Sequence, residues 1–475
     1  MTVNEEMNAS TKRIFEDYPV AKALSAMVMP TIISQLILVV YNLADTWYVG
    51  QTGNADAVAA VSLCLPVYTI LSAISNLFGI GGASAVARAL GSHNENKARQ
   101  TFAIAIYAGL TTSILYAILI YTFCRPLLML IGGDSGDIDY AVSYLEWTTV
   151  IGAIPTILAP TFAHMIRASG KPKVASFGMV FGALLNIGLD PLFMFVLLPH
   201  GQEVAGAAIA TMISNTVSLI YFLIYICLNA DGSIYSFCFY RDEDNLAIFK
   251  DIFFCGIPGF CMQAFAMFSN CFLNSMLSSM GSEAVAGIGI VRKIDQLAFS
   301  INQGITQGML PLVAYCYSSG RHERMKSLIR CSAISTFVFS LLCTCLSLLF
   351  APQFVSVFIR DEATIRFGAE FLRVICLSVP VYSITFVIIA VFQAVGRGIE
   401  PFILTIIRRG SLDIVLMFVI RATLGVSYIT MASPITELIA LCIGLIMLVH
   451  FLKSMREPND IAEASKQTST IKDND

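Results

Sequence analysis

Charge is the scarcest property of this sequence. Only 13% of its 475 residues are charged, whereas 56% are hydrophobic; soluble domains carry about 25% charged residues. The net charge of −3 gives no sign of a nucleic acid partner. The apolar residues fall in long runs separated by short polar loops, and no separate soluble domain is visible. This composition predicts an all-α membrane protein that crosses the bilayer many times.

Motifs for metal binding and for catalysis are also missing. No Cys-x-x-Cys pair occurs, and the five histidines are scattered without ligand spacing, so we expect no structural metal site. Gly170 and Lys171 are followed by Pro172 rather than by the Ser or Thr of a phosphate-binding loop, which argues against ATP coupling within the chain. The Gly-x-Ser-x-Gly and His-Glu-x-x-His patterns are absent as well. The protein is therefore predicted not to be an enzyme and to need no cofactor.

Long apolar windows, each able to cross about 30 Å of hydrocarbon, follow one another along the chain. The first is too long for the core of a signal peptide, so we expect it to remain as the first span. Loops rich in Lys and Arg alternate with loops poor in them. Since basic loops stay in the cytoplasm, both termini are predicted to be cytoplasmic. The twelve windows are residues 23–49, 57–87, 100–124, 140–164, 173–198, 204–229, 249–277, 284–313, 328–351, 367–394, 401–424 and 427–452.

The two halves of the chain resemble each other. Three residues of the first window recur in the seventh window at a constant separation of 228 residues. Six spans return the chain to the side from which it started, so the repeat predicts two parallel six-helix lobes. Two lobes that rock about a central cavity are typical of a transporter. The recurring residues are Pro30, Gln35 and Asn42, which match Pro258, Gln263 and Asn270.

The repeat also predicts the domain organisation. We expect an N-terminal lobe over residues 1–229, a cytoplasmic linker over 230–248 and a C-terminal lobe over 249–455. Residues 456–475 form a polar tail that has too few apolar residues to pack and is expected to be disordered.

One stretch, from Gly178 to Pro191, concentrates polar residues inside an apolar window. Gly178, Gly182, Asn186 and Asp190 are spaced four residues apart, so two small residues, an amide and a carboxylate share one helix face. Pro191 removes a backbone donor, so the helix should kink or open beside the acid. An ionisable residue inside a membrane span is a functional candidate by default.

A second carboxylate, Asp45, lies near the far end of the first window. At about 1.5 Å per residue, both it and Asp190 fall in the outer half of the bilayer, where they could meet. Two carboxylates in one low-dielectric pocket repel each other, so one readily keeps a proton that a transmembrane gradient can load and unload. With Asn186 and Thr211, the same oxygens could instead hold a dehydrated Na⁺. The alternative is that Asp190 and Asn186 only hydrogen-bond across helices and hold them together.

Other polar and aromatic residues of the windows are candidates for lining a substrate cavity. Aromatic and methionine side chains offer an adaptable apolar wall with cation–π capacity. Asn42 could equally well pack against a neighbouring helix. For the charged residues of the eighth and eleventh windows, mutual ion pairing takes precedence over a substrate role. The candidates are Gln35, Tyr41, Asn42, Tyr68, Met262, Gln263, Phe265, Asn270, Arg292 and Arg408.

Several motifs resemble those of multidrug and toxic compound extrusion (MATE) transporters. The second window carries Asn-Leu-Phe-Gly-Ile-Gly-Gly at residues 76–82. The loop after the fourth window reads Arg-Ala-x-Gly-Lys-Pro from Arg167, and the fifth window contains Asn186-x-x-x-Asp190-Pro191. The resemblance covers nearly all of the chain and is strongest to bacterial members of the staphylococcal multidrug-exporter type.

The resemblance implies a twelve-helix, two-lobed antiporter in the inner (cytoplasmic) membrane of a bacterium. Such a protein would export small organic cations or amphipathic drugs by alternating access, in exchange for H⁺ or Na⁺, and we expect it to be monomeric. In the branch of the family with a cation site in the N-terminal lobe, the ligands correspond to Asp45, Asn186, Asp190 and Thr211.

Two other functions stay open at this point. A flippase of lipid-linked precursors shares the helix arrangement of the wider superfamily, but it would need a strongly cationic cavity. Only Arg292, Lys293, Arg408 and Arg409 could supply one. A membrane receptor or an intramembrane enzyme is the third reading, against which the internal repeat and the missing catalytic motifs count.

Overall fold

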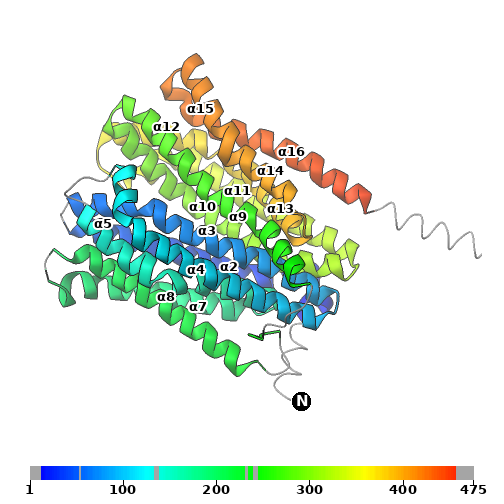
Figure 1. Ribbon diagram of the computed structural model, residues 1–475. Coiled ribbons are helices and arrows are strands. Elements are labelled where there is room, and N and C mark those ends of the chain that lie inside the picture. The colour runs from blue at the N-terminus through cyan, green and yellow to red at the C-terminus, as the bar shows by residue number, and fades with distance from the viewer. Residues whose placement is uncertain are drawn as a thin grey trace, which may run out of the picture.

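The computed structural model describes residues 12–52, 55–132, 138–199, 201–230, 234–238 and 244–455, and these residues contain helices and no strand (Figure 1). The predicted tail, 456–475, and parts of the predicted linker lie outside the described residues. In the first half the elements are η1 (Arg13–Asp17), α2 (Val20–Gln51), α3 (Ala55–Gly91), α4 (Glu95–Ile131), α5 (Ile138–Leu145), η2 (Glu146–Ile151), α6 (Ala153–Ala168), α7 (Pro172–Leu192), η3 (Phe193–Leu197) and α8 (Glu203–Leu228). In the second half they are α9 (Asn245–Leu277), η4 (Ser278–Met280), α10 (Ser282–Ser318), α11 (His322–Ser356), α12 (Glu362–Ile375), α13 (Ser378–Ala394), α14 (Ile399–Thr405), η5 (Ile406–Ser411), α15 (Leu412–Thr423), η6 (Val426–Met431) and α16 (Ala432–Ser454).

Each of the twelve windows falls on helical structure, but not all are equally apolar. Within the described residues, eight helices are long and apolar enough to cross a membrane, and ten if each of two bent pairs is counted as one span. The pairs are α5–η2 with α6, bent by 49°, and α12 with α13, bent by 44°. The windows 284–313 and 401–424, which hold the predicted ion-pairing residues such as Arg292 and Arg408, are not among these spans. The all-helical multi-span fold is confirmed, while the number twelve and the side of the termini stay predictions.

The two halves of the chain lie against each other through closely approaching helices. Figure 1 shows α7 and α8 on one side of the molecule and α15 and α16 on the opposite side, with α3, α9 and α10 between them. α2 packs along α10, and α3 packs along α9. At Gly304 and Gly308 of α10, a Cβ atom would come within 2.9 Å of the Ile32 and Val28 Cα atoms of α2. The Gly-x-x-x-Gly pattern therefore serves close helix packing.

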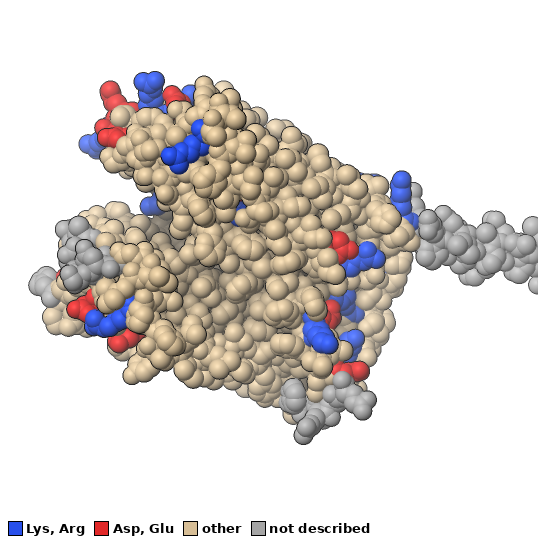
Figure 2. All heavy atoms as spheres, turned by 45° about the horizontal axis from the view of Figure 1, so that its top comes forward, with Lys and Arg blue, Asp and Glu red and all other residues tan. Residues whose placement is uncertain are grey.

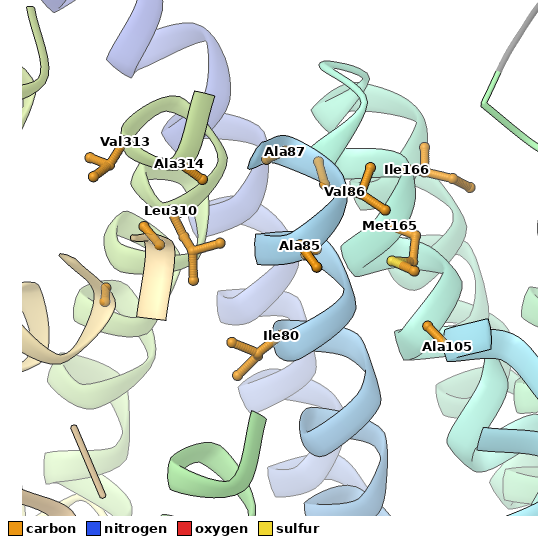
Figure 3. Packing of buried hydrophobic residues seen from close by; sticks show 14 of the residues in the cluster. Ile80, Ala85, Val86, Ala87, Ala105, Met165, Ile166, Leu310, Val313 and Ala314 are labelled. Atoms are coloured by element: carbon orange, nitrogen blue, oxygen red, sulfur yellow. The ribbon is translucent and has the colours of Figure 1, made fainter. Parts of the chain in front are cut away.

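Small and branched apolar residues fill the space around α3. Figure 3 shows Ile80, Ala85 and Val86 on α3, between residues of α10 on one side and Met165 of α6 on the other. A Cβ atom at Gly82 would lie 2.7 Å from the Met165 Cε atom, so a larger residue there would require the Met165 side chain to move. α3 thus lies at the centre of the bundle, and helices of both halves pack against it.

Both described ends of the chain lie at the same end of the bundle. The ring of Phe15 in η1 stacks on Tyr315 near the end of α10, with centroids 4.7 Å apart. Phe451, near the end of α16, contacts Tyr317, two residues further along α10. We call this end of the bundle the terminal end; it lies on the right in Figure 1.

The terminal end is closed, and the opposite end is open. At the terminal end Arg88 of α3 donates to Asp251 of α9 at 2.6 Å and to Ser84 at 2.5 Å. The same guanidinium lies 3.4 and 3.3 Å from the carbonyl oxygens of Gln393 and Ala394 at the end of α13. Figure 2 shows charged side chains gathered at the two ends and a surface hollowed between the halves at the end away from the termini.

Candidate functional site

Asp190 lies near the end of α7 and is fully buried. The Asn186 amide, one turn earlier, donates to Asp190 Oδ2 at 2.9 Å while its oxygen accepts from the Thr211 backbone N–H at 3.1 Å. α7 continues through Pro191 and ends where the N–H of Phe193 reaches the carbonyls of Leu189 and Asp190; the chain then widens into the π-helical segment η3. The predicted opening beside the acid thus takes the form of a π turn that follows the proline.

The glycines upstream of Asp190 form the contact of α7 with α8. A Cβ atom at Gly178 would lie 2.5 Å from the Phe222 ring, and one at Gly182 would overlap Ser218 Oγ. The Ser218 hydroxyl donates to the Gly178 carbonyl at 3.1 Å. These contacts bring α7 close enough to α8 for Asn186 to reach Thr211.

Asp45 approaches the same site from α2, which packs along α7. Its carboxylate is close enough to Asp190 to interact with it electrostatically. Asp45 Oδ1 is buried and has no hydrogen-bond partner among the described residues. Tyr41 and Tyr68 are also close enough to interact with Asp45 electrostatically. The structure therefore brings together all four residues of the sequence-predicted cation site.

A central cavity of about 300 Å³ lies beside this cluster, between the two halves of the chain. α2, α3, α6, α7 and α8 line it from the first half, and α9 and α10 line it from the second. Half of the predicted substrate residues are on its wall. They are Gln35, Tyr41, Asn42, Tyr68 and Gln263.

The other predicted substrate residues lie elsewhere. Met262 lines a smaller cavity of about 50 Å³ next to the central one. Phe265 packs against Gly410 of η5. Neither Arg292 nor Asn270 is on the wall of the central cavity. Arg292 instead donates to the side chain of Asn274 at 3.1 Å and to the carbonyl of Asn270 at 3.3 Å.

Arg408 is part of a buried group of charges in the second half. It makes a two-pronged ion pair with Glu437 of α16, at 2.6 and 2.8 Å, and both side chains are at most 2% exposed. Nearby, Ser269 donates to Asp413, and Tyr382 donates to Asp295 at 3.3 Å. Ion pairing is the role predicted for these charges, but no local pattern indicates that α16 supplies the acid.

His164 and Arg167 are among the residues of the central cavity that the sequence analysis did not propose. The basic-loop pattern assigned Arg167 to a cytoplasmic loop, whereas the structure places it in the last turn of α6, only 4% exposed. It lines both the central cavity and the smaller one. The apolar window stopped short of Arg167 because a charge counts against a span, although the long stem of arginine can be buried.

Comparison with known proteins assigns the chain to a family. The chain is 29% identical to the multidrug export protein MepA of Staphylococcus aureus (strain NCTC 8325 / PS 47) over 94% of its length and 97% of that protein. It is 28% identical to MepA of Staphylococcus haemolyticus (strain JCSC1435), over 95% of this chain and 97% of that protein.

Solved structures share the fold. A MATE structure in the straight conformation superposes with a TM-score of 0.87 at 23% identity, covering 94% of this chain and 99% of that one. An outward-facing multidrug resistance MATE family transporter gives a TM-score of 0.84 at 23% identity, over 94% of this chain and 99% of that one. The MatE family model matches twice, at residues 30–192 and 258–419. Because these two segments cover more than half of the sequence, the chain belongs to the MatE family.

Proposed function

We propose that this protein exports drugs or other toxic compounds by alternating access, as a cation-coupled antiporter. Members of its family are transporters rather than enzymes, as the missing catalytic motifs predicted. The similarity to the multidrug export protein MepA along almost the whole chain supports the substrate class, small organic cations or amphipathic drugs. A cavity that both halves line, and that is open towards only one end of the bundle, supports the alternating-access mechanism.

The observation that carries the coupling mechanism is the pair of acids at the end of α7 and in α2. Asp190 is fully buried, and Asp45 next to it has a buried oxygen without a partner. Uncompensated carboxylates inside a membrane protein are costly and mark ion or proton pathways. A proton or a Na⁺ ion would relieve the repulsion between them.

The donor set suits either coupling ion. Asp45, Asp190 and the Thr211 hydroxyl offer oxygen ligands, which Na⁺ prefers, and a turn of the Asn186 amide would add its oxygen to them. A single proton shared by the two acids would serve equally well. In both cases, binding at Asp190 changes the charge beside the π turn of η3. It thereby favours a different arrangement of α7 and η3, which form the fifth span, and of the cavity wall.

The chain is a multi-pass membrane protein by its apolar helices and its family. We further propose that it resides as a monomer in the cytoplasmic membrane of a bacterium, with the terminal end in the cytoplasm. The alternation of basic loops supports this orientation. In this arrangement the central cavity faces outward.

The flippase alternative is not favoured by the distribution of charge. It needs a strongly cationic cavity, but Arg292 and Arg408 make hydrogen bonds and ion pairs outside the central cavity. Among the described residues that line the central cavity, Arg167 is the one Lys or Arg.

Transport by Asp190→Asn tests the coupling site. The purified variant is reconstituted in proteoliposomes, and dye uptake is driven either by an imposed pH gradient or by an imposed Na⁺ gradient. We expect Asp190→Asn to lose ion-driven transport while inserting normally. Asp139→Asn, which changes an exposed acid paired with Arg125, should transport like the unaltered protein. Normal ion-driven transport by Asp190→Asn would refute the assignment, and comparing the two gradients identifies the ion.

A further inference from the structure

The closed end of the central cavity carries a buried guanidinium. Arg167 occupies the last turn of α6, where its Nη1 lies 3.3 Å from His164 Nδ1 and 3.4 Å from Gln307 Oε1. Its Nε is buried and has no hydrogen-bond partner among the described residues. The two N–H groups of Nη2 take part in neither contact and are left for a ligand in the cavity.

No acid neutralises Arg167 in the part of the chain that the structure describes. It takes part in none of the ion pairs there. Neither the central cavity nor the smaller cavity has Asp or Glu on its wall. Arg408, by contrast, is buried to a similar degree and is fully paired with Glu437. A buried charge without a partner is costly and is retained where a ligand supplies the opposite charge.

The neighbours of Arg167 hold it in place without cancelling its charge. A Cβ atom at Gly79 would lie 2.7 Å from the ring of His164, so the imidazole is packed tightly against α3. Gln307 Oε1 also accepts a hydrogen bond from Gln35 of α2, at 3.1 Å. The guanidinium is therefore positioned from both halves of the chain, on α6 and on α10.

The rest of the cavity wall suits a neutral or aromatic body. Eight side-chain amides line it, and Tyr41 and Tyr68 add aromatic faces with hydroxyl groups. The smaller cavity next to Arg167 adds the apolar side chains of Met262 and Phe386. Aromatic rings and amides bind flat, amphipathic molecules, and a guanidinium selects a carboxylate or phosphate on them.

We propose that Arg167 and His164 form an anion-binding site at the closed end of the central cavity, which takes the carboxylate of an amphipathic aromatic substrate. This inference rests on the proposed function and narrows its substrate class. Zwitterionic compounds are bound in preference to their cationic esters, and acidic compounds in preference to their neutral esters.

A matched pair of dyes tests this preference. One is a rhodamine with a free carboxylate, and the other is its ethyl ester, which keeps the fluorophore and its positive charge. Binding to the purified full-length protein in nanodiscs is measured by fluorescence anisotropy, and uptake is measured in proteoliposomes. We expect the acid to bind at least about tenfold more tightly than the ester, the size of one charge-assisted hydrogen bond.

Three variants separate ligand binding from a structural role. Arg167→Gln should bring acid and ester to within about twofold of each other by weakening the acid alone, since the ester makes no charge-assisted hydrogen bond. Gln307→Glu keeps the acceptor for Gln35 but supplies an internal acid beside Arg167, and should abolish the preference while the fold is retained. Arg421→Gln, on an exposed residue of α15, is the control for the loss of one positive charge and should change neither affinity.

The outcomes separate the anion site from the transport function. Equal affinities for acid and ester, or equal weakening of both in Arg167→Gln, would overturn the anion site and leave export intact. Loss of acid binding when phosphatidylglycerol is added to the nanodiscs would assign Arg167 to a lipid headgroup and overturn the substrate assignment. Absence of uptake for both dyes together with a preserved binding preference would count against the proposed export instead.

Discussion

The closure of the terminal end depends on Arg88, and its removal should let that end open more often. The guanidinium joins α3 to α9 through Asp251 and to α13 through the carbonyls of Gln393 and Ala394. Asp251 is 37% exposed, so its ion pair contributes at most about 1 kcal/mol. The hydrogen bonds to the carbonyls use a charged donor, and each such bond contributes about 1.5–3 kcal/mol.

A net loss of about 2 kcal/mol in Arg88→Gln corresponds to an open fraction about 30 times larger. The chain has a native reporter for this change, because Cys255 is completely buried beside Arg88. The assay is the rate of maleimide labelling of Cys255, followed by peptide mass spectrometry. Loss of the guanidinium beside the thiol would by itself slow labelling, because the thiolate is the nucleophile. A faster rate therefore reports opening.

Two controls complete this experiment. Cys64 is buried within the first half, against Ala60 and Tyr144, and should stay protected if the halves move as rigid bodies. Asp251→Asn should give a smaller acceleration than Arg88→Gln, because only the exposed ion pair is weakened. Labelling of Cys255 at the original rate in Arg88→Gln, or equal acceleration at Cys64, would refute the reasoning.

Three further changes test other contacts. Arg408→Met should lower the melting temperature in detergent, because an unpaired buried Glu437 costs about 3–5 kcal/mol, whereas the double variant Arg408→Met/Glu437→Leu should recover most of the loss; equal melting temperatures would contradict this. The hydrogen bond from Tyr315, at 2.5 Å, lowers the pKa of Glu16. The contact therefore stabilises η1 fully at pH values above the ordinary pKa of a glutamate side chain. This stabilisation is lost as the pH falls through the lowered pKa of Glu16. Hydrogen exchange of η1 should rise over that range, but should show no such step in Glu16→Gln. Gly308→Val should overpack the contact of α10 with α2 by about 1–3 kcal/mol, seen as a lower melting temperature, and an unchanged value would argue against close packing there.

The sequence predicted the helices and the acid face well because both are local patterns. An apolar run of sufficient length becomes a helix in a membrane whatever its neighbours are. The four-residue spacing from Gly178 to Asp190 fixes one helix face without knowledge of the partner helix. That Asp45 would meet this face followed less directly, since it depends on the packing of α2 along α7.

Features that depend on distant partners could not be predicted. Glu437 is 29 residues from Arg408 and on another helix, so no spacing rule connects the two. Arg167 looked like a loop residue because hydropathy counts its charge and not its stem. The π segments within the spans, η2, η3 and η5, have no compositional signal, because they arise from one additional residue in a turn that the surrounding packing accommodates.

The π turn of η3 sets the angle between the buried face of α7, which carries Asp190, and the buried face of the segment that follows. An α-helix completes a turn in about 3.6 residues, so the additional residue of a π turn sets the side chains on its two sides about 100° apart from their α-helical relationship. Asp190 precedes this step, and Met194, almost fully buried, lies within it. The carboxylate can therefore face Asn186 and Asp45 while the end of the span keeps its own buried face. The angular offset between the two faces comes from one additional residue. Deleting a single residue of η3 would therefore turn one of these two faces away from its partners.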